Sequence, residues 1–127
     1  MRNCLFFLLI SCFGFSASHA EAQSQNAGFI HVVYFWLKEG TTSAQRTEMV
    51  KQLKSLRELK VVRKLSIGGP ANTPRPVVDN SYDIALIVEF RDRAAQDSYL
   101  VSQKHLDVVA AIDGYIQKMQ VYDTILE

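Results

Sequence analysis

Cysteine is nearly absent from this chain of 127 residues, and its two copies, Cys4 and Cys12, both lie near the N-terminus. If residues 1–20 are removed, as argued below, no disulfide, thiol nucleophile or cysteine-bound metal remains. Proline is also scarce, with all three copies in residues 70–80. Neither sign of charge dominates, because the chain has 14 basic and 13 acidic residues. Such a balance provides no basic surface for phosphates, so we expect no nucleic-acid partner.

No apolar run is long enough to span a membrane, which needs about 20 apolar residues. The longest one, residues 4–15, follows a basic residue and precedes the small residues Ser18 and Ala20, which is typical of a secretory signal peptide. We therefore expect residues 1–20 to be removed and the protein to be exported, to the periplasm or outside the cell. In an alternative interpretation, residues 9–12 are a lipoprotein processing site and Cys12 carries a lipid anchor.

After a polar lead-in at residues 21–28, which we expect to be flexible, residues 29–38 (FIHVVYFWLK) form the strongest predicted strand. Side chains alternate along a strand, and here both faces are apolar. Both faces therefore need cover, which we expect from helices on one side and from a second subunit on the other. The first face carries Phe29, His31, Val33, Phe35 and Leu37, and the second carries Ile30, Val32, Tyr34 and Trp36.

The rest of the chain divides into helices and strands by hydrophobic period. A helix is predicted over 42–58, and Thr42 with Gln45 forms its capping-box start. Strands are predicted over 61–69, 82–90 and 115–125. Two helices are predicted over 93–101 and 103–112, the second ended by Asp113-Gly114, and the break near Ser102 can bring Tyr99 and His105 together. Residues 70–80 form a long loop, and such loops are often functional. The order β-α-β-β-α-β predicts an α+β domain over 29–127: a ferredoxin-like antiparallel sheet with helices on one face.

Four motifs in order resemble the stress-responsive A/B barrel family, or Dabb family, over nearly the whole of residues 29–125. They are the opening strand from His31 to Lys38, the pairs Tyr82-Asp83 and Glu89-Phe90 of the third strand, Tyr99 followed six residues later by His105, and Val121-Tyr122-Asp123 near the end. The resemblance implies a dimeric α+β barrel in which the sheets of two subunits meet.

The resemblance also implies a chemistry. A plant polyketide-cyclising enzyme of the family uses a Tyr and a His, at positions that match Tyr99 and His105, for an aldol cyclisation. The family commonly has His-Pro where this chain has Ser102-Gln103, and the cyclase has a His where this chain has Ile84. Whether the chain is an enzyme at all stays open at this point.

The candidate site is a pocket between the sheet and the helices. Tyr99 and His105 are its candidate catalytic residues, since an imidazole can act as an acid or a base near neutral pH and a phenol both donates and accepts hydrogen bonds. The candidate substrate-binding residues are His31, Val33, Ile84 and Leu86, which the predicted strands place on the helix-facing side. Each polar residue also has a structural interpretation: His105 holding the helix junction, Tyr99 packing on the sheet, and His31 a buried core residue. We expect no metal and no cofactor, because the histidines lack metal-ligand spacing.

Three functions fit these observations. The first is an exported homodimer that binds a small apolar or phenolic molecule, with cyclase or lyase chemistry. The second is a non-enzymatic dimer with a structural or stress-protective role. The third is a monooxygenase or haem-handling enzyme built on a related α+β barrel.

Overall fold

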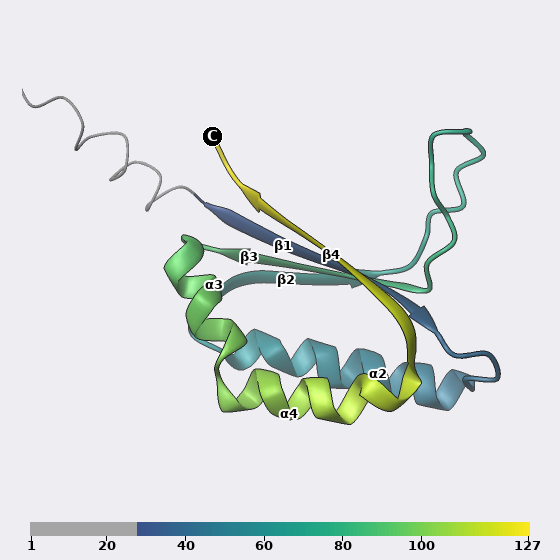
Figure 1. Ribbon diagram of the computed structural model, residues 1–127, viewed down its shortest axis with the longest axis horizontal. Helices are drawn as coiled ribbons and strands as arrows, with labels where there is room; N and C mark the ends of the chain where they lie inside the picture. Colours follow the sequence, from purple (N-terminus) through teal and green to yellow (C-terminus); the bar gives the residue numbers. More distant parts are fainter. Residues whose placement is uncertain (1–27) are drawn as a thin grey trace, which may run out of the picture.

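The computed structural model describes residues 28–127, so the expected signal peptide, the Cys12 alternative and residues 21–27 lie outside the described part. A four-stranded antiparallel sheet is covered by helices on one face (Figure 1). The elements are β1 (Phe29–Leu37), α2 (Ser43–Ser55), β2 (Val62–Gly68), β3 (Ile84–Phe90), α3 (Arg93–Leu100), α4 (Gln103–Ile112) and β4 (Ile116–Ile125), with 3-10 turns at Leu56–Glu58 and Asp113–Tyr115. This order confirms the ferredoxin-like prediction.

The strands lie in the order β2-β3-β1-β4, so β1 is a central strand with a neighbour on each side. Its pairing with β3 places Val33 opposite Leu86. Its pairing with β4 places Val33 opposite Val121 and His31 opposite Asp123. Residues from the middle and the end of the chain therefore meet beside the first strand.

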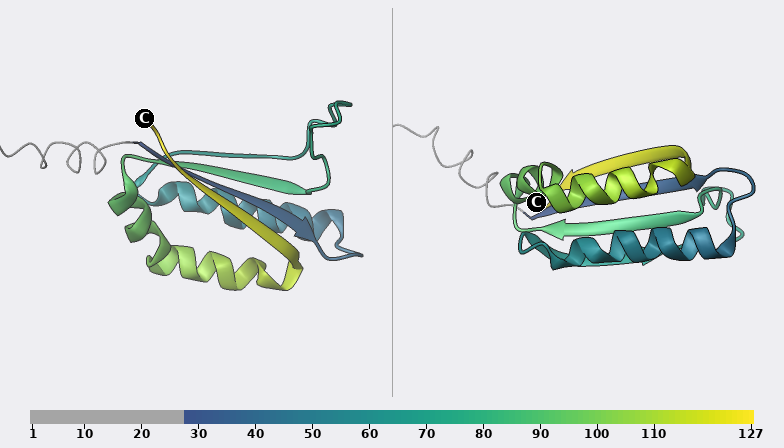
Figure 2. Two further views of the ribbon diagram at one scale, coloured as in Figure 1. Left: turned by 45° about the horizontal axis from the view of Figure 1, so that its top comes forward. Right: turned by 90° about the horizontal axis from the view of Figure 1, so that it is seen from below.

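The two faces of β1 have different surroundings. Phe29, His31, Val33 and Phe35 are buried beneath the helices, whereas the residues between them are only partly buried. Figures 1 and 2 show α2, α3 and α4 all on one side of the sheet. The second apolar face of β1 is thus left without cover within one subunit.

The core lies between the sheet and the helix layer. Its largest fully buried side chains are Tyr99, Phe90, Met49, Leu53, Leu56, Ile84 and Val88. Burying each such apolar side chain contributes roughly 1.5–3 kcal/mol. Within residues 28–127 no helix has the length and apolar character needed to cross a membrane.

The start of α2 agrees with the predicted capping box. The Thr42 side chain accepts a hydrogen bond from the Gln45 backbone amide at 3.2 Å, and the Gln45 side chain accepts one from the Thr42 amide at 2.8 Å. The regular α-helix ends at Ser55, earlier than the predicted 58, because its last turn tightens into the 3-10 turn. Such tightening satisfies carbonyls that would otherwise lack partners at a helix end.

The loop of residues 70–80 projects away from the helix layer (Figure 1). A hydrogen bond from the Asn80 side chain to the Thr73 carbonyl, at 3.0 Å, closes it. The strand that follows begins at Ile84, two residues later than predicted, although the Asp83 amide still donates to the Phe35 carbonyl at 2.9 Å. None of residues 70–80 lines the cavity described below.

Candidate functional site

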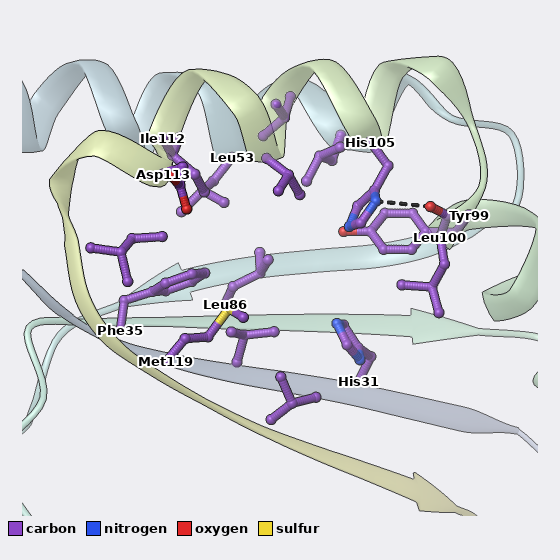
Figure 3. Close-up of a pocket in the computed structure, with 16 residues that line it drawn as sticks. His31, Phe35, Leu53, Leu86, Tyr99, Leu100, His105, Ile112, Asp113 and Met119 are labelled. Carbon is purple, nitrogen blue, oxygen red and sulfur yellow. Dashed lines mark hydrogen bonds between the residues drawn. The ribbon is translucent and has the colours of Figure 1, made fainter.

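A cavity of about 340 Å³ lies between the helix-facing side of the sheet and helices α2, α3 and α4 (Figure 3). Most of its surface is apolar, as is usual for small-molecule sites. It is lined by His31, Val33, Phe35, Leu53, Leu56, Leu86, Tyr99, Leu100, His105, Val108, Val109, Ile112, Asp113, Ile116, Met119 and Val121.

Five of the six candidate site residues line this cavity: His31, Val33, Leu86, Tyr99 and His105. The sixth, Ile84, does not, which corrects the expectation for that residue. Ile84 lies opposite Phe35 at the start of β3 and is fully buried in the core. Alternation along a strand predicts which face a side chain occupies, but not whether neighbouring side chains leave space beside it.

His31 is held by a carboxylate on the neighbouring strand. Its Nδ1 lies 2.6 Å from Oδ1 of Asp123, while the His31 side chain is 8% exposed and that of Asp123 43% exposed. A carboxylate only accepts hydrogen bonds, so Nδ1 carries the proton and Nε2 is the other functional position of the ring. The contact fixes both the tautomer and the orientation of the imidazole.

The interruption between α3 and α4 brings Tyr99 and His105 together, as the sequence predicts. Six residues in an unbroken helix make roughly 1.7 turns and would direct the two side chains apart. Here Ser102 begins a new helix: its hydroxyl accepts from the His105 amide at 3.3 Å and donates to the Tyr99 carbonyl at 2.8 Å. The two ring centroids are therefore only 4.5 Å apart.

His105 also contacts the end of the preceding helix. Its Nδ1 lies 3.1 Å from the Leu100 carbonyl oxygen. Since a carbonyl only accepts, Nδ1 is the donor, and in the neutral imidazole Nε2 is left as an acceptor. The same contact thus supports the helix junction and sets the tautomer.

The three rings gather at one end of the cavity. The Tyr99 ring lies 6.1 Å from that of His31, edge to face, and 5.0 Å from that of Phe90. Figure 3 shows the hydroxyl of Tyr99 directed into the cavity, beside His105 and above His31. One phenol and two imidazoles from three different elements therefore face a common space.

Burial governs the protonation of this group. Tyr99 is 1% exposed, and burial raises the pKa of its phenol well above the ordinary value. Burial also lowers the pKa of His105; the hydrogen bond to Leu100 partly opposes this effect, and the nearby His31 adds to it. Around neutral pH Tyr99 is therefore a hydrogen-bond donor and His105 a neutral base.

We expect the protein to lose stability as pH falls below about 6.5, and to lose it more steeply than a His105→Gln variant. The folded state holds the pKa of His105 below its unfolded value, so in this range the unfolded chain binds more protons. The stabilising contribution is complete above the unfolded pKa and disappears as pH falls through the folded pKa. Urea unfolding at a series of pH values between about pH 8 and pH 5 measures how the free energy of unfolding changes with pH in the two proteins. Equal slopes for the two proteins would contradict the lowered pKa.

The opposite end of the cavity carries a carboxylate. Asp113, at the C-terminal end of α4, lines the cavity together with the apolar residues between the two ends. Val109 on α4 and Met119 and Val121 on β4 also line it and remain exposed. The cavity therefore opens between α4 and β4 through an apolar mouth.

Across residues 28–127 no group of three or more His, Cys, Asp or Glu side chains is arranged to hold a metal ion. The functional groups that the cavity offers are two imidazoles, one phenol and one carboxylate. This set can donate and accept protons around a polar group of an otherwise apolar molecule.

Asp113 and the partner of His31, Asp123, are site residues that sequence reasoning missed. Asp123 belonged to a recognised motif, but its contact with His31 depends on the register between β1 and β4. The sequence around Asp113, followed by Gly114, indicates only the end of a helix. Asp123 would have been found by pairing the last strand antiparallel to the first, because this register places Asp123 opposite His31.

The sequence profile of the stress responsive A/B barrel domain matches residues 29–126. Comparison with curated protein sequences gives no match. Among solved structures, a Dabb family protein with a ferredoxin-like fold from Mesorhizobium loti is 21% identical, with a TM-score of 0.67 over 80% of this chain and 98% of that one.

Two further structures show the same fold. A dimeric ferredoxin-like protein of unknown function from Thermobifida fusca is 16% identical, with a TM-score of 0.68 over 80% of this chain and 93% of that one. Hydroxynitrile lyase from Passiflora edulis is 14% identical, with a TM-score of 0.70 over 80% of this chain and 95% of that one. The shared fold therefore occurs in at least one enzyme.

Proposed function

The chain belongs to the stress responsive A/B barrel family, and on that premise we propose that it is a homodimer whose subunits each bind a small apolar molecule bearing a carbonyl or phenol group. At this group it performs acid–base chemistry of the lyase or cyclase type. The observation that carries the proposal is the Tyr99–His105 contact, 4.5 Å between ring centroids, at the end of an apolar cavity of about 340 Å³.

Each polar residue has a role in this chemistry. The Tyr99 hydroxyl donates a hydrogen bond to the substrate carbonyl oxygen, because its raised pKa keeps it protonated. Nε2 of His105 takes a proton from the carbon beside that carbonyl, because Nδ1 is committed to Leu100. His31, oriented by Asp123, binds and orients the substrate. The resulting enolate can form a carbon–carbon bond by aldol addition, and the reverse sequence breaks one.

Two relatives support this class of reaction. The hydroxynitrile lyase from Passiflora edulis shares the fold, and the resemblance in the helix motif extends to a polyketide cyclase. In both reactions a carbon–carbon bond is made or broken at a carbonyl carbon. The phenol and two imidazoles that line one end of the cavity support the same class of reaction.

Ligand binding tests the proposal. Mass spectrometry after gentle purification detects a co-purifying ligand, and thermal shift with hydrophobic phenols and aryl ketones detects binding. We expect stabilisation that grows with ligand concentration. It should disappear in Val109→Trp, which fills the mouth, and persist in Val101→Trp, an exposed position outside the cavity lining. No stabilisation by any of these compounds would count against the proposal.

We also propose that the second, uncovered face of the sheet binds a second copy of the chain. It presents Ile30, Val32, Tyr34 and Trp36, and soluble monomers rarely expose contiguous apolar surface of more than a few hundred Å². In a twofold dimer, this patch on each subunit covers the same patch on the other subunit. The dimeric description of the Thermobifida fusca protein supports this arrangement.

Export is part of the same proposal. Residues 1–20 have the pattern of a signal peptide, and the part of the chain that follows contains no cysteine. A protein of this kind would meet its ligand in the periplasm or outside the cell. The lipid anchor at Cys12 is the alternative.

The contacts of His105 with the helix junction favour a second candidate function, a non-enzymatic dimer. We expect His105→Ala to lower the free energy of unfolding by about 1 kcal/mol, the ordinary loss of one hydrogen bond, and also to abolish chemistry on bound carbonyl compounds. Leu106→Ala, at an exposed neighbouring position, is the control. Loss of stability in His105→Ala, with no chemistry on carbonyl compounds in either protein, would favour the non-enzymatic function.

A further inference from the structure

The two ends of the cavity have opposite chemical character. At one end lie the hydrogen-bonding rings of Tyr99, His105 and His31, and at the other lies the carboxylate of Asp113. Figure 3 shows Asp113 and the Tyr99–His105 pair at opposite ends of the row of labelled side chains. Eight residues of helix separate His105 from Asp113, which is about 12 Å at 1.5 Å per residue.

The surface between the two ends is apolar. It is formed by side chains from α2, α4 and β4, among them Leu53, Val108, Ile112 and Met119. A molecule that occupies the whole cavity must therefore be apolar along its length. Its two ends meet different polar groups, so the cavity can distinguish one orientation of an elongated ligand from the other.

The end at Asp113 carries the one acidic side chain of the cavity lining. Asp113 lies at the C-terminus of α4, where the carbonyl groups of the helix already carry partial negative charge. Within residues 28–127 it makes no ion pair. The Lys38 ammonium group lies nearby but donates to the Gly114 carbonyl at 2.9 Å. The cavity lining itself includes no lysine or arginine.

A carboxylate at this helix end opposes the helix dipole, so its position costs the fold a small amount of stability. A cation bound there would gain from the carboxylate and from the helix carbonyls together. A neutral ligand end would gain from neither, and an anionic end would be repelled. The position therefore selects between ligands by the charge of the end that reaches Asp113.

We propose that Asp113 binds a cationic group of the ligand, so that the preferred ligand is an elongated apolar carbonyl compound with a positive charge at the end opposite its carbonyl. This inference rests on the proposed function, because it places the carbonyl at the Tyr99 end. It adds a second specificity determinant that takes no part in the proton transfers.

Three matched probes test the inference. They are methyl ketones on one linear alkyl chain, ending in a trimethylammonium group, its neutral isostere tert-butyl, or a carboxylate, each made at graded chain lengths. The quaternary ammonium cannot condense with the ketone. Calorimetric titration gives the dissociation constant of each probe, and the readout is the ratio of ammonium to tert-butyl affinity.

We expect Asp113→Asn to reduce this ratio about threefold, the size of an exposed ion pair, and high salt to reduce it in the unmodified protein. Asp113→Lys should instead favour the carboxylate probe. Asp107→Asn, on the same helix but outside the cavity lining, should leave the ratio unchanged. A ratio that is equal in all variants would overturn the role of Asp113. If none of the ketones binds, the proposed function itself fails.

Discussion

Replacing Val32 and Tyr34 together with lysine is expected to convert the proposed dimer into monomers or aggregates. Both side chains lie on the uncovered face of β1, where they alternate with the buried residues that face the helices. Two ammonium groups in a self-complementary interface face two more from the partner copy, and desolvating unpaired charge costs several kcal/mol. The expected change is the loss of the dimer from light scattering at micromolar concentration.

Aromatic packing explains why Tyr34 is central to this face. Its ring centroid lies 4.8 Å from that of Tyr82 and 6.2 Å from that of Tyr122, so β1, β4 and the segment that precedes β3 contribute to one aromatic cluster. The matched control is Val101→Lys, the same substitution at a valine that is 75% exposed on the helix side. It should remain dimeric. A monomeric unmodified protein at micromolar concentration would overturn both the interface and the barrel arrangement.

The second large effect is expected at Tyr99. Its side chain is 1% exposed and packs against Phe90, His31 and His105. Tyr99→Ala should lower the free energy of unfolding by about 3–5 kcal/mol, as truncation of a buried aromatic ring does. For a domain of this size the melting temperature should fall by more than about 10 °C.

Tyr99→Phe separates the ring from the hydroxyl. The ring keeps its packing, and the hydroxyl is directed into the cavity (Figure 3), so stability should change little. Chemistry on a bound carbonyl compound should fall strongly, because the donor to the carbonyl oxygen is lost. If Tyr99→Phe were as unstable as Tyr99→Ala, the hydroxyl would be a structural group rather than a functional one.

Much of the fold could be predicted because its signals are local. The alternation of residues 29–38 predicts both faces of β1, and Thr42 with Gln45 predicts the start of α2. The helix break at Ser102 predicts the meeting of Tyr99 and His105, since its hydroxyl caps the next helix. Each of these features depends on residues close together in the chain.

The remaining parts of the site depend on long-range geometry. The His31–Asp123 contact joins residues 92 positions apart and follows from strand register, which short-range patterns do not determine. Ile84 shares a strand face with Leu86, yet only Leu86 meets the cavity, because packing decides where space remains. Asp113 has the sequence context of a helix end, and its position at the cavity depends on how α4 packs over the sheet.

Family membership and chemistry are separate conclusions for this chain. The fold accommodates many functions, so function has to be argued from the residues in the site. This chain has Ser102-Gln103 and Ile84 where the polyketide cyclase and its relatives have other residues. Its site therefore has its own set of groups: one phenol, two imidazoles and a distant carboxylate.

The measurement that tests the central claim most directly is proton exchange on a bound ketone. An aryl methyl ketone is incubated with the protein in deuterium oxide, and NMR follows the loss of its methyl proton signal. We expect exchange faster than in buffer, saturable in ketone, abolished in His105→Gln, reduced in Tyr99→Phe and unchanged in Asp107→Asn. Saturable binding of the ketone with exchange no faster than in buffer would contradict the acid–base role of Tyr99 and His105.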